Sequence, residues 1–219
     1  MTSVRAALID YGAGNLRSVA KALERSGFAV DVTSDAAVVA RADGVVLPGV
    51  GAFRDAAERL RESGLEDACK RAIESGRPYL GLCFGLQLLF EEGTEHGVTK
   101  GFGILRGRVE RFPETDSDGS SLTVPHIGWN EVAFDKSGER GAHPMLQRLP
   151  DKDYFYFVHS YRPVPADETI TVGRTNYGGE FCSAVATDRI FAAQFHPEKS
   201  QAAGKRLLDA YKAWVEDAR

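Results

Sequence analysis

The sequence predicts an α/β fold, a single domain with a mixed, mostly parallel central sheet that is flanked by helices and extended by antiparallel strands. In the first half of the chain, short apolar segments alternate with segments of helical spacing, which is typical of βαβ units. Beyond Gly101, strand-like segments follow one another directly, which indicates antiparallel additions. The 219 residues suffice for one substantial domain and are few for two, so we expect one domain over residues 1–219.

The parallel part of the sheet is predicted from four short apolar segments, at residues 4–10, 28–33, 44–49 and 78–82. Helices are expected between them, at 15–26 and from Phe53 on. The segment 78–82 is apolar throughout, as expected of a strand that is buried on both faces. From Cys83 the spacing becomes helical, because Leu86, Leu89 and Phe90 lie at i, i+3 and i+4. This predicts a helix directly after the strand.

The second half of the chain contains six strand-like segments: RGRVERF, LTVPHIGWNEVAF, DYFYFVHSYRPV, TITVGRTN, EFCSAVATD and IFAAQFH. Turn-rich segments such as PETDSDGSS separate them. The C-terminal segment from Ser200 has apolar residues at helical spacing, which predicts an amphipathic helix that closes the domain.

Composition and charge exclude several classes of function. With 43% hydrophobic and 26% charged residues, the chain has the composition of a soluble globular protein. A formal net charge of -4 without a long basic run argues against nucleic-acid binding. The apolar N-terminal segment is interrupted by Arg5 and Asp10 and is too short for a signal peptide or a membrane span. We therefore expect no membrane association and a cytoplasmic location.

The three cysteines are widely spaced and include no CxxC pair, which argues against a disulfide framework and a zinc site. We expect no metal, because no Cys and His residues have metal-ligand spacing, and no other cofactor. Cys69 and Cys182 are predicted to be inert packing residues on a helix and a strand. The DYGAGN segment at 10–15 lacks both GxGxxG and the lysine of a phosphate-binding loop, so we reject nucleotide binding.

Cys83 is the candidate nucleophile. It lies in GLCFG, where an apolar strand is expected to turn sharply into a helix, and this is the nucleophile-elbow pattern with cysteine in place of serine. Gly81 and Gly85 remove side chains that would collide with the turn. The backbone N–H groups at the start of the helix favour thiolate over thiol. A small buried core cysteine is the alternative interpretation.

His196 and Glu198 are the candidate base and its orienting acid. In an extended backbone, side chains at i and i+2 project to the same side, so Glu198 could hold one ring nitrogen of His196. The other nitrogen would then be free to take a proton from sulfur and deliver it to a leaving amine. A plain turn after an edge strand is the alternative for this segment.

The VVLPGVGAF segment at 45–53 is the candidate oxyanion hole. It ends a buried strand with a proline and two glycines, and such a loop can point successive N–H groups inward. The expected donors are the amide of Val50 or Gly51 and the amide of Phe84, which follows the nucleophile. An ordinary turn between strand and helix is the alternative.

The remaining histidines are predicted to have no part in catalysis. His96 and His143 lie in polar, turn-like segments and are expected to be exposed to solvent. His126 and His159 lie in aromatic, strand-like segments, where we expect buried, hydrogen-bonded side chains.

Together, GLCFGLQLLFEE, PGVGAF and HPEKS resemble the class I (triad) glutamine amidotransferases. More narrowly, DYGAGNLRSV, PHIGWN, YFVHSYR and QFHPEKS are similar to the glutaminase subunits of imidazole glycerol phosphate synthases, and the resemblance runs nearly end to end. It implies a domain that hydrolyses L-glutamine to glutamate and ammonia through a cysteine thioester. A cyclase subunit would form a heterodimer with the chain and use the ammonia to make imidazole glycerol phosphate and aminoimidazole carboxamide ribotide in histidine biosynthesis.

The resemblance also implies roles for individual residues. Cys83, His196 and Glu198 would be the catalytic triad, and residues 49–51 the oxyanion strand. The positions that match the family's glutamine pocket are Gly49, Gln87, Glu95, His159, Ser160 and Tyr161. Trp129, Asn130 and Lys199 would lie toward the cyclase. Ala52 departs from relatives that carry a larger polar residue there, which leaves the surroundings of the oxyanion hole open but not its backbone donors.

Two further interpretations of function remain beside this one. The chain could be another triad enzyme, such as the glutaminase of anthranilate or aminodeoxychorismate synthesis or a γ-glutamyl hydrolase, but those are expected to lack DYGAGN and PHIGWN. It could also be a silent scaffold, against which the intact triad residues argue.

Because glycines flank Val50, we hypothesise that its peptide rests with the N–H turned away from the oxyanion hole and that partner binding shifts this population.

Overall fold

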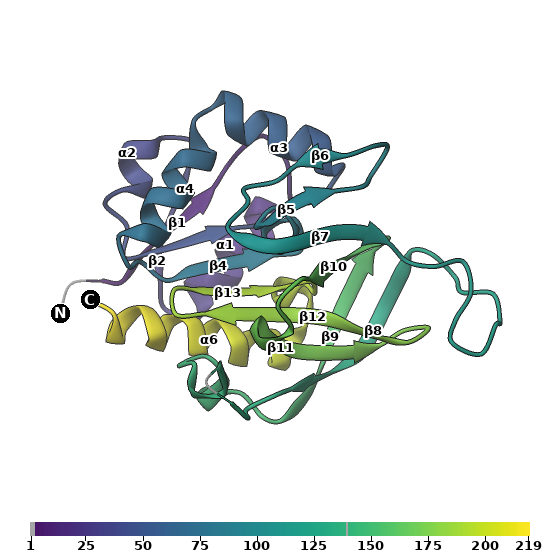
Figure 1. The fold of residues 1–219 in the computed structure, drawn as a ribbon. Coiled ribbons are helices and arrows are strands. Elements are labelled where there is room, and N and C mark those ends of the chain that lie inside the picture. The colour runs from purple at the N-terminus through teal and green to yellow at the C-terminus, as the bar shows by residue number, and fades with distance from the viewer. Residues whose placement is uncertain (1–2, 139) are drawn as a thin grey trace.

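The computed structural model describes residues 3–138 and 140–219, and its centre is a nine-stranded mixed sheet (Figure 1). The strand order is β2-β1-β3-β4-β13-β12-β11-β8-β9. The parallel strands are β1 (Arg5–Ile9), β2 (Ala29–Thr33), β3 (Gly44–Leu47), β4 (Tyr79–Leu82) and β13 (Ile190–Ala193). The antiparallel strands are β12 (Glu180–Thr187), β11 (Thr171–Asn176), β8 (His126–Phe134) and β9 (Lys152–His159). The predicted fold class is therefore confirmed.

Helices cover both faces of this sheet because its inner strands are buried on both sides. On β1, Ala6 and Leu8 face one apolar core while Ala7 and Ile9 face the other. The first core is covered by α1 (Leu16–Arg25) and α6 (Gln201–Asp217). The second is covered by α2 (Ala36–Val39), α3 (Phe53–Glu62) and α4 (Leu65–Glu74). Figure 1 shows α6 below the sheet and α3 and α4 above it.

A second, four-stranded sheet packs beside the first and was not predicted. Its order is β10-β7-β5-β6, with β5 (Phe90–Gly93), β6 (Thr99–Lys100), β7 (Leu105–Arg111) and β10 (Tyr161–Pro165). The segment DYFYFVHSYRPV, expected as one strand, therefore divides at Ser160 between the two sheets. Of LTVPHIGWNEVAF, the strand β8 includes only the part from His126 on.

The helix predicted after Cys83 is present, but its predicted extension to Phe90 is wrong. The helix α5 is a single turn, Phe84–Gln87, and Phe90 already begins β5. The backbone carbonyls of Leu88 and Leu89 accept hydrogen bonds from residues 102–105, and β5 pairs with β7 in parallel. These partners are distant in sequence, so tertiary pairing overrides a local spacing that only three apolar residues defined.

Two predictions about buried side chains are confirmed and one is wrong. His126 and His159 are buried, and so are Cys69 and Cys182, whose thiol pKa values burial raises to about 12. His96 is exposed as expected. His143, also expected to be exposed, is buried. Among the residues that the structure describes, no helix is long and apolar enough to cross a membrane.

His143 is buried because the polar-looking segment that carries it folds over α6. Its ring centroid lies 4.6 Å from that of Trp214, and its Nδ1 accepts a hydrogen bond from the Met145 amide at 3.2 Å. Burial lowers the pKa of His143 from 6.5 to about 4. The folded protein therefore keeps this ring neutral at a pH at which the unfolded chain protonates it.

This burial predicts a loss of stability in mild acid. As the pH falls from 6.5 toward 4, the unfolded chain binds a proton that folded His143 does not, and the free energy of unfolding should fall by about 3 kcal/mol from this residue. Urea unfolding across this pH range measures it. In His143→Asn, whose side-chain oxygen can still accept from the Met145 amide, the free energy of unfolding should depend less on pH. Equal pH dependence in both proteins would contradict the prediction.

Candidate active site

Cys83 lies at a strained elbow between β4 and α5. Its backbone has φ 54° and ψ -101°, a conformation that L-residues rarely adopt. A Cβ on Gly81 would collide with the Gly85 carbonyl group, and a Cβ on Gly85 would collide with the Leu47 carbonyl. The predicted reason is therefore confirmed for Gly81, whereas Gly85 avoids a collision with the neighbouring strand β3. The elbow holds the sulfur at the carboxyl end of the parallel strands, the usual place for a site in an open α/β sheet.

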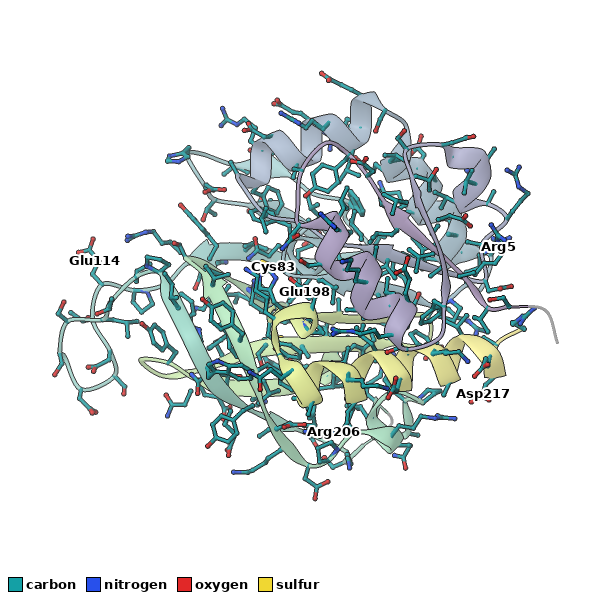
Figure 2. The ribbon with its side chains drawn as sticks, turned by 180° about the vertical axis from the view of Figure 1, so that it is seen from behind. Arg5, Cys83, Glu114, Glu198, Arg206 and Asp217 are labelled. Atoms are coloured by element: carbon teal, nitrogen blue, oxygen red, sulfur yellow. The ribbon has the colours of Figure 1, made fainter. Side chains whose placement is uncertain are left out.

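His196 and Glu198 lie beside this sulfur. The Nδ1 of His196 and the Oε1 of Glu198 are 2.8 Å apart, and both side chains are almost fully buried. The Nε2 of His196 is buried without an aligned hydrogen-bond partner, and the Cys83 sulfur interacts with the ring. Figure 2 shows Cys83 and Glu198 in the same region of the molecule.

The pKa of His196 is set by opposing effects. Burial alone lowers it, but the interactions with Cys83 and Glu198, through hydrogen bonding and negative charge, outweigh burial and raise the pKa from 6.5 to about 10. The site therefore stabilises the imidazolium form of His196. A protonated ring beside the sulfur favours the thiolate, which is the nucleophilic form of cysteine.

The extended backbone predicted for His196–Glu198 is wrong, although the two side chains meet. Pro197–Lys199 form a 3-10 turn, and it is this turn that brings the Glu198 carboxylate back to His196. Ser200 anchors the turn, because its Oγ donates to the His196 carbonyl at 2.6 Å and accepts from the Tyr156 amide at 3.0 Å. The sequence pattern identified the pair but not the backbone that joins it.

A pocket of about 390 Å³ opens at the sulfur. Its lining contains most of the residues predicted for the site: Val50, Gly51, Cys83, Phe84, Gln87, Glu95, His159, Ser160, Tyr161 and Lys199, together with Pro125 and Val158. Gly49 is outside this lining. A Cβ at Gly49 would collide with the Tyr11 hydroxyl and lie 2.6 Å from the Phe84 Cβ, so Gly49 allows close packing behind the loop.

The loop of residues 48–52 closes one wall of the pocket. Glu95 holds its end, since its Oε2 accepts from the Phe53 amide at 2.6 Å. Within the described residues, the amide N–H groups of Gly51 and Phe84 have no hydrogen-bond acceptor, which leaves them free to bind an oxyanion. Gly51 has φ 118°, a conformation that favours glycine.

Tyr11 was missed by the sequence analysis and lies behind this loop. Its side chain is 6% exposed, and its hydroxyl has no aligned hydrogen-bond partner. Burial and the nearby charge of Cys83 raise its pKa, while the N–H of Val50 acts in the opposite direction. The Val50 amide therefore lies close to the Tyr11 hydroxyl without forming an aligned hydrogen bond to it, and this hydroxyl does not line the pocket. The only signal in the sequence for a role of Tyr11 was that it is the aromatic residue of the DYGAGN motif.

Gln194 was also missed. It is fully buried, and its Nε2 lies 3.5 Å from the Cys83 sulfur. The signal in the sequence was a polar residue within the apolar segment IFAAQF, next to the predicted base region.

The residues predicted to face a partner lie on β8 and in the turn after β13. Trp129 is 49% exposed and forms a patch with its exposed neighbours Ile127 and Tyr154. Lys199 lies 5.5 Å above the Tyr156 ring. Asn130 instead directs its amide inward, to His126 at 3.2 Å and to the Asn176 carbonyl at 2.9 Å. Among residues 3–138 and 140–219, no cluster of three His, Cys, Asp or Glu side chains could hold a metal ion.

Comparison with known proteins decides the family. A family model described as "Glutamine amidotransferase class-I" matches residues 7–211. The chain belongs to the class-I glutamine amidotransferase family. Among solved structures, the amidotransferase resembles PurLQS from Thermotoga maritima with a TM-score of 0.70 at 19% identity, covering 100% of both chains, a likeness that concerns the fold.

Curated relatives are more similar in sequence. The amidotransferase is 49% identical over 214 residues to a protein named imidazole glycerol phosphate synthase subunit HisH from Aquifex aeolicus, covering 97% of this chain and 98% of the relative. It is 51% identical to the protein of the same name from Aromatoleum aromaticum, covering 95% and 98%. These shares extend across nearly the whole length of each protein.

Proposed function

We propose that the chain is the glutaminase subunit of an imidazole glycerol phosphate synthase, active with a cyclase subunit as a heterodimer in the cytoplasm. The observation that carries this proposal is the strained Cys83 elbow beside the His196–Glu198 pair, at the head of a pocket large enough for an amino acid. The identity to proteins named as HisH subunits supports the assignment to this synthase.

The first half of the reaction forms a thioester. The Cys83 thiolate attacks the γ-carbonyl carbon of glutamine, and the carbonyl oxygen becomes an oxyanion. The Phe84 amide and an amide of residues 50–51 would donate hydrogen bonds to it. When the tetrahedral intermediate collapses, the C–N bond breaks and protonated His196 gives its proton to the leaving nitrogen, which departs as ammonia.

The second half releases glutamate. Neutral His196 takes a proton from a water molecule, whose oxygen attacks the thioester carbon. The C–S bond then breaks, glutamate leaves, and the thiolate beside imidazolium is restored. Glu198 orients the ring through the 2.8 Å contact to Nδ1, which stabilises each imidazolium state.

The rest of the pocket suits the α-ammonium and α-carboxylate of a free amino acid. Glu95 contributes a carboxylate and Lys199 an ammonium group to the lining. Charged groups of both signs can pair with a zwitterion, and buried polar partners reject analogues that leave them unpaired. Ser160 and Tyr161 lie on the wall formed by the start of β10.

A partner is expected for a chemical reason. Ammonia released into water at neutral pH is protonated to ammonium, which is not a nucleophile, so it must pass through a shielded route. The exposed patch of Ile127, Trp129 and Tyr154, next to Lys199, is our candidate for the cyclase contact.

The direction of the Val50 amide supports the gating hypothesis. That amide lies near the Tyr11 hydroxyl, which is outside the pocket lining, but the two form no aligned hydrogen bond. A peptide flip at Val50 would complete the hole. Binding of the cyclase and its substrate would shift the population toward the flipped form.

Tyr11→Phe should raise the basal glutaminase rate of the isolated chain by about twofold to threefold, because it removes the polar hydroxyl that attracts the Val50 N–H in the resting form. The rate with the cyclase should change little. Steady-state release of glutamate, with and without partner, measures both rates. Tyr211→Phe is the control, since it removes a buried hydroxyl that bonds the Val45 and Pro78 carbonyls. An unchanged or lower basal rate in Tyr11→Phe would refute the proposal that the Tyr11 hydroxyl holds the Val50 peptide in its resting form.

Co-purification with candidate cyclase subunits, followed by an assay of ammonia transfer from glutamine, tests the function. A stable pair that makes imidazole glycerol phosphate from glutamine is the expected result. Pairing with an anthranilate or aminodeoxychorismate synthase instead would identify a different amidotransferase. A pair in which Cys83 does not react with a glutamine-mimicking electrophile would indicate a scaffold.

A further inference from the structure

Gln194 is a fully buried polar side chain in direct contact with the nucleophile. Its Nε2 lies 3.5 Å from the Cys83 sulfur, and its Oε1 lies 3.0 Å from the Gln87 Nε2. An N–H donor at this distance from sulfur stabilises the anion more than the neutral thiol. The role of Gln194 therefore depends on whether its amide nitrogen or its amide oxygen faces the sulfur.

The contacts of Gln87 fix that orientation. The Gln87 Nε2 also lies 3.1 Å from the Tyr161 carbonyl oxygen, which can only accept. Gln87 must therefore present its NH2 group, and its two hydrogens are used by Tyr161 and Gln194. The Gln194 atom that faces Gln87 must then be its oxygen, which places the NH2 group of Gln194 against the sulfur.

A buried histidine pair holds the Tyr161 carbonyl in turn. The Nδ1 of His159 donates to this carbonyl at 2.8 Å, so its Nε2 is an acceptor and receives the Nδ1–H of His126 at 3.0 Å. Burial lowers the pKa of His159 to about 3 and of His126 to about 4, so both rings are neutral. His126 then accepts from Asn130 at 3.2 Å. Because the Tyr161 carbonyl oxygen can only accept, it determines which atom donates in each of these hydrogen bonds.

We infer that Gln194 is a further catalytic residue of the glutaminase site, whose amide donates an N–H···S hydrogen bond that favours the Cys83 thiolate, with Gln87 as the positioning residue that sets its direction. The inference rests on the proposed function, because it assigns the nucleophile to Cys83. In this step the thiol proton passes to His196, and Gln194 keeps both of its hydrogens.

Other groups also act on this sulfur and must stay constant in the test. The titratable side chains around Cys83 come from several elements and are Tyr11, Glu95, His159, Tyr161, His196, Glu198 and Lys199. Gln194 carries no charge, so replacing it by leucine changes the donor without changing any of these. Gln194→Glu has nearly the same shape but sets a carboxylate oxygen, which cannot donate, against the sulfur.

The experiment measures the rate at which iodoacetamide alkylates Cys83 as a function of pH, in the chain bound to its partner, with mass spectrometry to separate Cys83 from Cys69 and Cys182. In Gln194→Leu the pH of half-maximal rate should rise by about one unit or more, and further in Gln194→Glu. The kcat for glutamine should fall about tenfold to hundredfold while KM changes little. The control is Gln147→Leu, the same exchange at a glutamine that donates to the Gly141 carbonyl away from the pocket.

A pH profile that is unchanged in folded Gln194→Leu would overturn the inference and leave Gln194 a structural residue. If the variants do not fold, nuclear magnetic resonance of the wild-type chain decides. The side-chain amide of Gln194 should shift with the same pH midpoint as the alkylation of Cys83, and an amide signal that is constant over that range would contradict it.

These results are separable from the proposed function. Alkylation needs no glutamine turnover, so a chain that fails to hydrolyse glutamine but shows the shifted profile would refute the function and keep the role of Gln194. If the wild-type chain hydrolyses glutamine but the Gln194 variants show an unshifted alkylation profile, the proposed function stands and the role of Gln194 is refuted.

Discussion

Cys83→Ala should lower glutamine-dependent synthesis by the complex at least about 10⁴-fold, because no other group in the pocket can form the thioester. Synthesis from added ammonium salts should remain largely intact, since the cyclase then receives ammonia without the glutaminase. Assays of the same complex with glutamine and with ammonium chloride measure both activities.

A second buried cysteine, Cys69, provides the control for this variant. Cys69→Ala removes a buried thiol of α4 in the apolar core and should leave both activities near the wild-type level. If Cys83→Ala lost both activities, Cys83 would be needed for the fold or for docking, and the chemical role assigned to it would be wrong.

Gly85→Ala should lower the free energy of unfolding by about 3 kcal/mol or more, or prevent folding. Helix propensity alone favours alanine in α5 by about 1 kcal/mol. The added Cβ, however, would collide with the Leu47 carbonyl oxygen and lie 2.9 Å from its carbon, and β3 is held between β1 and β4. Crowding should therefore dominate, and urea unfolding measures the result.

Gly119→Ala is the matched control for crowding. Gly119 has φ 83° with no atom within 4 Å of an added Cβ, so this exchange costs only backbone strain of about 1 kcal/mol. Equal losses in the two variants would show that contact with Leu47 is not what requires glycine at position 85.

The sequence by itself determined the elements that local patterns describe. The strands β1 to β4, the helices α1, α3 and α6 and the elbow at Cys83 follow from apolar runs, helical spacing and the paired glycines. Residues that share a short motif, such as His196 and Glu198, could be paired from their spacing, because neighbours in the chain are neighbours in space.

Only the tertiary structure decided what depends on segments far apart in the chain. The second sheet is completed by pairing of β7 with β10, where Arg111 is opposite Tyr161, and His143 is buried by a helix that begins more than fifty residues later. Gln194 meets Cys83 across a separation of 111 residues. Local spacing carries no information about such contacts, because the hydrogen bonds and apolar burial that stabilise them are formed between segments only when the whole sheet assembles.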